Sequence, residues 1–310
     1  QDLMRYAAIL QTNWDWRAAA NFMFGGGGGA LLLAAAIAGS GASVHLPATL
    51  LGMALIGAGL TMVWLEIGRP WRAANVMFKP QNSWMTREAY VAGCAFLLAA
   101  GSVLFRLTWL TMAAGIAGIA FLYCQARILR AAKGVPAWRE PSIVMLVVTT
   151  GMVEGVAYLV IVQAAFSEPS GNIQMLLVGF LILRLFAWFL YRGRLFSSDP
   201  PSQVIAALPR LGSRFVLFGH FLPVLFIAGS YLDSPFSLIN ISISAILVVL
   251  SGWYLKFVLI TRLAHVQGFG LGKLQRGHPL ILNGHQKVSE ASVRLHKTRE
   301  REILNQRRNK

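Results

Sequence analysis

Two groups of ionisable side chains are placed where they could do chemistry, and the first lies inside long apolar stretches of the 310-residue chain. Ionisable residues at membrane depth are costly and usually functional. Glu154 and Arg184 each lie near the middle of such a stretch. At ~1.5 Å of helix rise per residue their depths differ by roughly 8 Å or less, a gap that an arginine side chain largely covers. We therefore predict that they form an ion pair, either as a structural contact between helices or as a step in a proton path.

The second group begins where an apolar stretch ends, at Glu66 and Arg69, and continues with Trp84 and Arg87. A helix stop and a helix cap explain the small and hydroxyl residues between them, but not this concentration of charges and indole rings. A quinone needs a flat apolar slot, a hydrogen-bond donor for each carbonyl and a carboxylate able to exchange protons. The group therefore predicts a quinone site with Glu66 and Arg69 as its reactive residues.

The histidines and cysteines do not suit other redox centres. Haem b in a helix bundle needs two facing histidines as a rule, and only His220 lies well inside an apolar stretch, where we interpret it as a hydrogen-bonded core residue. Cys94 and Cys124 cannot supply the four thiolates of an iron–sulfur cluster. We expect no haem, no iron–sulfur cluster and no metal in this chain. Lys256, near the end of the last apolar stretch, is expected to extend to the membrane surface.

Membrane-spanning helices must position these residues, because the chain is 56% hydrophobic and only 13% charged, against roughly a quarter charged in a soluble domain. Lipid offers the backbone no hydrogen bonds, so long apolar runs form helices, and these runs lack the alternation of barrel strands. The formal net charge of +16 is carried largely by links and tail. It therefore indicates contact with anionic membrane lipid, and we expect no nucleic-acid partner.

We predict an all-α integral membrane protein with eight transmembrane helices in two four-helix bundles, residues 1–140 and 141–264, followed by a polar, basic cytoplasmic tail, 265–310. The first bundle contains the quinone site. A tight turn near Arg106 separates the third and fourth spans, and a single long kinked helix is the alternative there. The predicted spans are Ala18–Gly39, Leu46–Ile67, Ala89–Phe105, Leu107–Leu129, Ser142–Phe166, Ile173–Tyr191, Phe215–Leu232 and Phe236–Thr261.

The links between these spans differ in charge on alternate sides. Links at residues 69–87, 127–139 and 192–214 are rich in arginine and lysine, whereas those after the first, fifth and seventh spans contain neither. Basic links face the cytoplasm by the positive-inside rule, so both termini are predicted to be cytoplasmic, which requires an even number of spans. Arg106, in a link that this arrangement places outside, is the one exception.

The segment GRPWRAANVMFKPQNSWMTREAY, residues 68–90, resembles the signature of the NrfD/DmsC/PsrC-type membrane subunits of molybdopterin oxidoreductases. Those proteins carry a Gly-Arg-Pro turn followed by Ser-Trp-x-(Ser/Thr)-Arg. Residues 12–28, 126–141 and 255–271 are similar to one branch of that family, which includes the anchors of sulfite-oxidising and phenylacetyl-CoA-oxidising complexes. The resemblance therefore runs nearly the whole length of the chain.

The resemblance implies a cofactor-poor anchor that exchanges electrons with membrane quinone, either menaquinone or ubiquinone. The implied partners are a four-cluster ferredoxin-like iron–sulfur subunit and a molybdopterin catalytic subunit. With the basic links inside, both are expected on the cytoplasmic side of a bacterial inner membrane. Some relatives have a histidine just before the Gly-Arg-Pro turn, and Glu66 would take over its proton role here. The quinone-binding positions that the resemblance implies, besides Arg69, are Trp16, Arg17, Asn21, Trp84 and Arg87.

A secondary transporter is the alternative function, because many membrane proteins without cofactors are carriers. Carriers often contain helices broken near the middle of the membrane, and Gly25–Gly29 could form such a break. The same run also favours close packing of helices, or an approach to a flat ligand. No matching break is evident in the second half of the sequence.

Overall fold

Eight apolar runs form long helices in the computed structural model, which describes residues 8–39, 43–67, 77–78, 80–167, 169–232 and 235–266. Each of the eight helices is long and apolar enough to cross a membrane, which confirms the predicted number of spans. The described residues all belong to one unit, Gln1–Gly270. The predicted tail 265–310 lies outside them except for its first two residues.

Seven spans are single helices and the seventh in order is composite. It joins α8 (Ser202–Val216), the π-helix η2 (Leu217–Phe221) and α9 (Leu222–Ser230). A short helix, α5 (Pro136–Arg139), lies between α4 and α6. The single helices are α1 (Trp16–Ala38), α2 (His45–Glu66), α3 (Trp84–Phe105), α4 (Thr108–Ala131), α6 (Ser142–Phe166), α7 (Gly171–Ser197) and α10 (Ser237–Thr261).

The seventh span begins 13 residues earlier than the predicted start at Phe215, because α8 begins at Ser202. Its buried side is apolar and includes Val204, Leu208 and Leu211, whereas Arg210 and Arg214 on the opposite side are exposed. An amphipathic stretch of this kind does not form an unbroken apolar run, so the sequence pattern detected only the second half of the helix.

The third and fourth spans are separate helices, as predicted, and the single kinked helix is wrong. Arg106 ends α3 in the left-handed conformation, with φ 53° and ψ 31°, and its backbone N–H bonds to the Ser102 carbonyl oxygen. Leu107 then precedes α4. The chain therefore reverses direction within two residues.

Replacing Arg106 with glycine should raise the free energy of unfolding by roughly 1 kcal/mol, because glycine adopts a left-handed turn without the Cβ clash of other residues. Leu107→Gly is the matched control. Leu107 has a negative φ of −87°, so glycine there only adds freedom to the unfolded chain and should lower stability. Thermal unfolding of both variants in detergent tests the opposite signs. Equal changes in the unfolding temperature of the two variants would show that the backbone at Arg106 is not strained.

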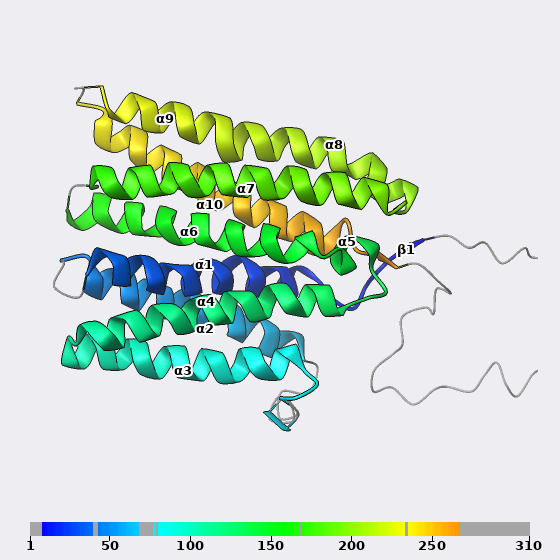
Figure 1. Ribbon diagram of the computed structural model, residues 1–310, viewed down its shortest axis with the longest axis horizontal. Helices are drawn as coiled ribbons and strands as arrows, with labels where there is room; N and C mark the ends of the chain where they lie inside the picture. Colours follow the sequence, from blue (N-terminus) through cyan, green and yellow to red (C-terminus); the bar gives the residue numbers. More distant parts are fainter. Residues whose placement is uncertain are drawn as a thin grey trace, which may run out of the picture. The chain divides into compact units, whose positions relative to one another are not determined.

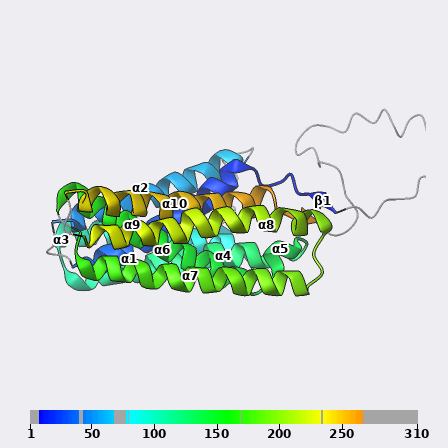
Figure 2. The same ribbon diagram turned by 90° about the horizontal axis from the view of Figure 1, so that it is seen from above.

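Helix α1 lies at the centre of the unit, in contact with α2, α4, α6 and α10 (Figures 1 and 2). Its glycines allow these contacts. A Cβ on Gly28 would lie 2.8 Å from the carbonyl oxygen of Gly52 in α2, and a Cβ on Gly29 would collide with the carbonyl oxygen of Gly118 in α4. The run Gly25–Gly29 therefore serves close helix packing. Helix α1 is unbroken through it, so the break that would have favoured a transporter is absent.

The helices pack in the order of Figure 1, where α3, α2 and α4 lie on one side of α1 and α6, α7, α10 and α9 lie on the other. Contacts of α1 with α6 and α10, and of α4 with α6, join the two sides. Helix α1 is thus shared by both groups of helices.

The start of α1 and the end of α10 lie at the same end of the helices. Strands β1 (Ile9–Leu10) and β2 (His265–Val266) pair antiparallel. Gln11 extends this contact, because its backbone N–H bonds to the Ala264 carbonyl oxygen at 2.9 Å and its side-chain amide to that of Ile260 at 3.1 Å. This arrangement agrees with an even number of spans.

Candidate functional site: an acidic pocket and a buried charge cluster

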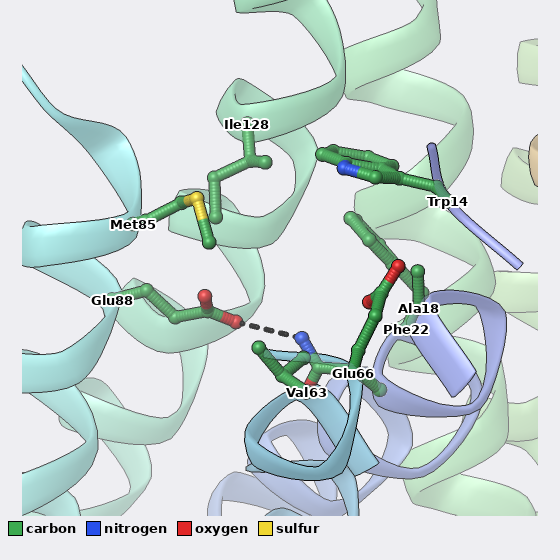
Figure 3. Close-up of a pocket in the computed structure, with 9 residues that line it drawn as sticks. Trp14, Ala18, Phe22, Val63, Glu66, Met85, Glu88 and Ile128 are labelled. Atoms are coloured by element: carbon green, nitrogen blue, oxygen red, sulfur yellow. Dashed lines mark hydrogen bonds between the residues drawn. The ribbon is translucent and has the colours of Figure 1, made fainter. Parts of the chain in front are cut away.

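A pocket lies near the ends of α1, α2, α3 and α4 that are closest to β1 and β2 (Figure 3). The cavity has a volume of about 40 Å³, which is small compared with the roughly 300–1,000 Å³ of most small-molecule sites. Two carboxylates enter it from different helices, Glu66 from the end of α2 and Glu88 from the first turns of α3. The remaining lining residues are Trp14, Ala18, Asn21, Phe22, Val63, Met85 and Ile128.

Glu88 is held by amide side chains from two other helices. Its Oε1 accepts a hydrogen bond of 3.3 Å from Asn21 Nδ2, the contact drawn in Figure 3, and the Gln125 side chain lies beside it. Gln125 Nε2 also donates to the backbone carbonyl of Asn21 at 3.1 Å. Glu88 is only 6% exposed and Asn21 3%. The pocket therefore contains a buried carboxyl group in a fixed orientation.

The predicted residues Glu66, Arg17 and Asn21 come together at this site. Arg17 ties the two helices that carry them, because its Nη1 donates to the Leu65 carbonyl oxygen at 2.8 Å, next to Glu66. Arg17 is itself fixed by Asp15, the N-cap of α1, through an ion pair of 2.8 Å. The hydrogen bonds that Arg17 donates to the Asp15 carboxylate hold the pKa of that carboxyl below its usual value. The end of α2 is thus fastened to the start of α1.

Trp84 and Arg87 lie beside the pocket rather than in its wall. The Trp84 ring is flanked by two guanidinium groups, with Arg87 at 4.3 Å and Arg127 at 4.4 Å from its centroid. Arg87 also donates to the carbonyl oxygens of Pro80 and Gln81, at 2.8 and 2.7 Å. This stack braces α3 against α4 and fixes the backbone that precedes α3. Trp84 and Arg87 therefore have a structural role in holding α3 in place.

The two remaining predictions for this site have different outcomes. Trp16 is 58% exposed and is not among the residues that line the pocket. Arg69 lies outside the described residues, as does the rest of the Gly-Arg-Pro turn.

Sequence reasoning assigned neither Trp14 nor Glu88 to the site. Trp14 stacks on Trp138 of α5, with ring centroids 5.0 Å apart, and Trp138 Nε1 donates to the Leu259 carbonyl oxygen at 2.8 Å. Helical spacing was the signal for Glu88, since Met85 and Glu88 are three residues apart and so share one face of α3. Nothing in the local sequence distinguishes Trp14 from Trp16, because their roles depend on where α1 begins.

A second polar site lies among α6, α7, η2 and α10, and it corrects two predictions. Glu154 pairs with Lys256, Oε2 to Nζ at 2.5 Å, so the predicted direct pair of Glu154 with Arg184 is wrong. Lys256 is 2% exposed, so the prediction that it reaches the membrane surface is wrong as well. Helical rise gives the depth of a residue but not the direction in which it points, and the register of α10 turns Lys256 inward.

Arg184 is fully buried and bonds to neutral groups. Its Nε donates to His220 Nε2 at 3.2 Å, and its other donors contact the carbonyl oxygens of Gly219 and Val248 and the hydroxyl of Ser251. Gly219 and His220 belong to η2, and π-helical turns are frequent at functional sites. His220 is thus a hydrogen-bonded core residue, as predicted.

The fold and these sites define the chain as a multi-pass helical membrane protein. No known protein family and no curated protein matches it. Within the described ranges, no group of three or more histidine, cysteine, aspartate or glutamate side chains could hold a metal ion.

Proposed function

We propose that this chain is the quinone-reactive membrane anchor of a molybdopterin oxidoreductase. The supporting observation is the pocket, which combines a slot lined by Trp14 and Phe22 with two carboxylates at one end of the membrane-spanning helices. Menaquinone and ubiquinone carry an apolar tail and a flat headgroup that exchanges two protons when it exchanges two electrons. The pocket offers both an apolar lining and proton-exchanging groups.

The residues present suit such a headgroup. Glu88 can hold or release a proton, and Asn21 fixes the carboxyl in place. Within the described part of the chain, Asn21 Oδ1 is buried without a hydrogen-bond partner and lies against Gly59 of α2. Glu66 lies nearer to the end of its helix, where it can exchange protons between the headgroup and water. Arg69, which follows in sequence, would complete the site as a donor.

The same proposal includes which end of the helices faces the cytoplasm and where the partner subunits bind. Basic residues such as Arg17, Arg127 and Arg192 lie at or near the helix ends on the side of β1 and β2, which favours this side as the cytoplasmic one in a bacterial inner membrane. The termini would then be cytoplasmic, and the helices would form two four-helix bundles, with α1 of the first bundle in contact with α6 and α10 of the second. A four-cluster iron–sulfur subunit and a molybdopterin catalytic subunit would dock on this side, within electron-transfer reach of the pocket.

A secondary transporter is the second candidate, and the buried cluster of Glu154, Lys256 and Arg184 favours it. Transporters place such charges on ion pathways. The pocket with two carboxylates at the edge of the membrane is not explained by transport alone, and for this reason we prefer the anchor.

Purification of the chain from its native membrane distinguishes the two. The proposal expects an iron-containing and a molybdenum-containing protein to copurify, quinone to be extractable with solvent, and no Soret band in the visible spectrum. The copurified complex should reduce or oxidise an added quinone analogue. A chain that purifies alone, binds no quinone and moves a solute across vesicles would be a transporter.

A further inference from the structure

Buried polar side chains form two groups that meet at α1. The first contains Glu88 and Gln125, and the second contains Lys256 and Glu154. Between them stands Gly26, in the middle of α1. A Cβ on Gly26 would lie 3.1 Å from Gln125 Oε1 and 3.2 Å from Lys256 Nζ. The absence of a side chain at this position therefore lets the two polar groups face each other past α1.

The free ends of both groups point to this gap. Among the described residues, Gln125 Oε1 is buried without a hydrogen-bond partner. Lys256 Nζ makes one bond, to Glu154, although an ammonium group can donate three. A Cβ on Gly27, the next residue of α1, would lie 3.0 Å from Glu154 Oε2. Glycines of α1 thus lie between the polar residues of the pocket and the buried ion pair.

Charge balance gives the ion pair an exchangeable proton. The ionisable groups that face it are Arg184 from α7 and Tyr158 from α6. Helix α1 presents glycines at this point, and α4 presents Gln125 and the apolar Leu122. His220 contacts the far side of Arg184. With Arg184 charged and Glu154 ionised, the cluster is neutral when Lys256 lacks its proton and carries one positive charge when Lys256 holds it. Gain and loss of this proton change the net charge of a cluster buried in a medium of low dielectric constant, and ionisable groups of this kind form the proton pathways of membrane proteins.

We infer that the Glu154–Lys256 pair is a proton-loading site that exchanges protons with Glu88 of the pocket through the gap at Gly26. This inference rests on the proposed quinone function and adds that turnover moves protons through the membrane interior. It assigns Lys256 as the residue that carries the proton, Glu154 as its counter-ion, and Gln125 as the group that orients the transfer.

The transfer balances in the direction of quinone reduction. The iron–sulfur partner supplies two electrons, and two protons must reach the two quinone oxygens. Glu88 gives up its carboxyl proton to one oxygen, and Glu66 gives up its carboxyl proton to the other. The ammonium of Lys256 then returns a proton to the Glu88 carboxylate, and Glu66 is reprotonated from water. Lys256 becomes a neutral amine and is reloaded from the opposite side. In quinol oxidation each transfer runs in reverse.

Two variants test this in the whole complex, reconstituted in liposomes with a soluble redox dye as electron donor and a short-chain quinone analogue as acceptor. Lys256→Gln removes the exchangeable proton and retains a donor for Glu154. Gly26→Ala inserts one methyl group between the flexible ends of Gln125 and Lys256. Gly57→Ala is the control, because a Cβ there meets only Phe96, at 3.6 Å. A voltage-sensitive dye reports charge movement for each quinone reduced.

The expected result is that wild type and Gly57→Ala build a membrane potential during turnover, while both test variants lose most of it, by about 10-fold per quinone reduced. Quinone binding should be unchanged in all four proteins. Wild-type turnover with a potential that neither variant lowers would overturn the inference and leave the quinone function standing. A wild-type complex that does not react with quinone at all would overturn both.

Discussion

Glu88→Gln should lower quinone turnover by about 100-fold, because general acid–base transfer by a positioned carboxyl contributes roughly that much or more. The glutamine keeps the size of the side chain and an acceptor for Asn21 Nδ2, so the pocket should keep its form. Electron transfer from the catalytic partner to a soluble dye bypasses the pocket and should be unaffected. The ratio of quinone-linked to dye-linked activity in purified complexes measures the effect.

The other reactive positions should behave in the same way. Glu66→Gln and Arg69→Ala are expected to abolish coupling to quinone while dye-linked activity persists. Glu140→Gln provides a matched control, since that carboxylate lies outside the pocket and accepts a hydrogen bond of 3.0 Å from Ser142, which glutamine can also accept. Quinone turnover that stays normal in Glu88→Gln would show that the pocket is not the quinone site.

Gly118→Val should prevent correct assembly of the helices. A Cβ at this position would overlap the carbonyl oxygen of Gly29, so α1 and α4 would have to move apart along their whole contact. A flexible side chain could adopt another rotamer to relieve the overlap, but the backbone atoms of Gly29 cannot. We therefore expect a loss in the free energy of unfolding at or above the upper end of the roughly 1–3 kcal/mol that overpacking usually causes. We expect the variant to yield little monodisperse protein after extraction in detergent.

Gly179→Val is the control for that change. Gly179 lies in α7, where a Cβ would meet nothing within 4 Å, so the added side chain should leave the yield and the thermal midpoint nearly unchanged. Size-exclusion profiles of the two variants from equal amounts of membrane make the comparison. A normal profile for Gly118→Val would contradict the close contact between α1 and α4.

The spans could be predicted because their signal is local. An apolar run of about 20 residues identifies a membrane helix whatever surrounds it, and a two-residue link such as Arg106–Leu107 leaves the chain little choice but to turn. The packing role of Gly25–Gly29 could also be predicted, since several glycines in one span favour close neighbours. Helix α8 was not predicted as part of the seventh span, because its exposed arginines interrupt the apolar run.

The partners of the buried charges could not be predicted, because they depend on how each helix is rotated about its axis. Glu154 and Arg184 lie on adjacent helices, α6 and α7, yet Glu154 reaches across to Lys256 on α10. For the same reason the sequence led to Trp16 rather than Trp14. The position of a residue in the sequence gives its depth along the helix axis. The side of the helix on which its side chain lies relative to the neighbouring helices is known only from the packed structure.

The pairing of β1 with β2 has a consequence for how the protein is made. Helix α1 leaves the ribosome before α10, yet the two helices are in contact, and strand β1 before α1 pairs with strand β2 after α10. The glycine-lined sides of the central helix therefore remain partly uncovered in the bilayer until α10 has been synthesised. A chain that terminates before α10 would leave these sides exposed to lipid, so quality control of the nascent chain is expected to depend on α10 and β2.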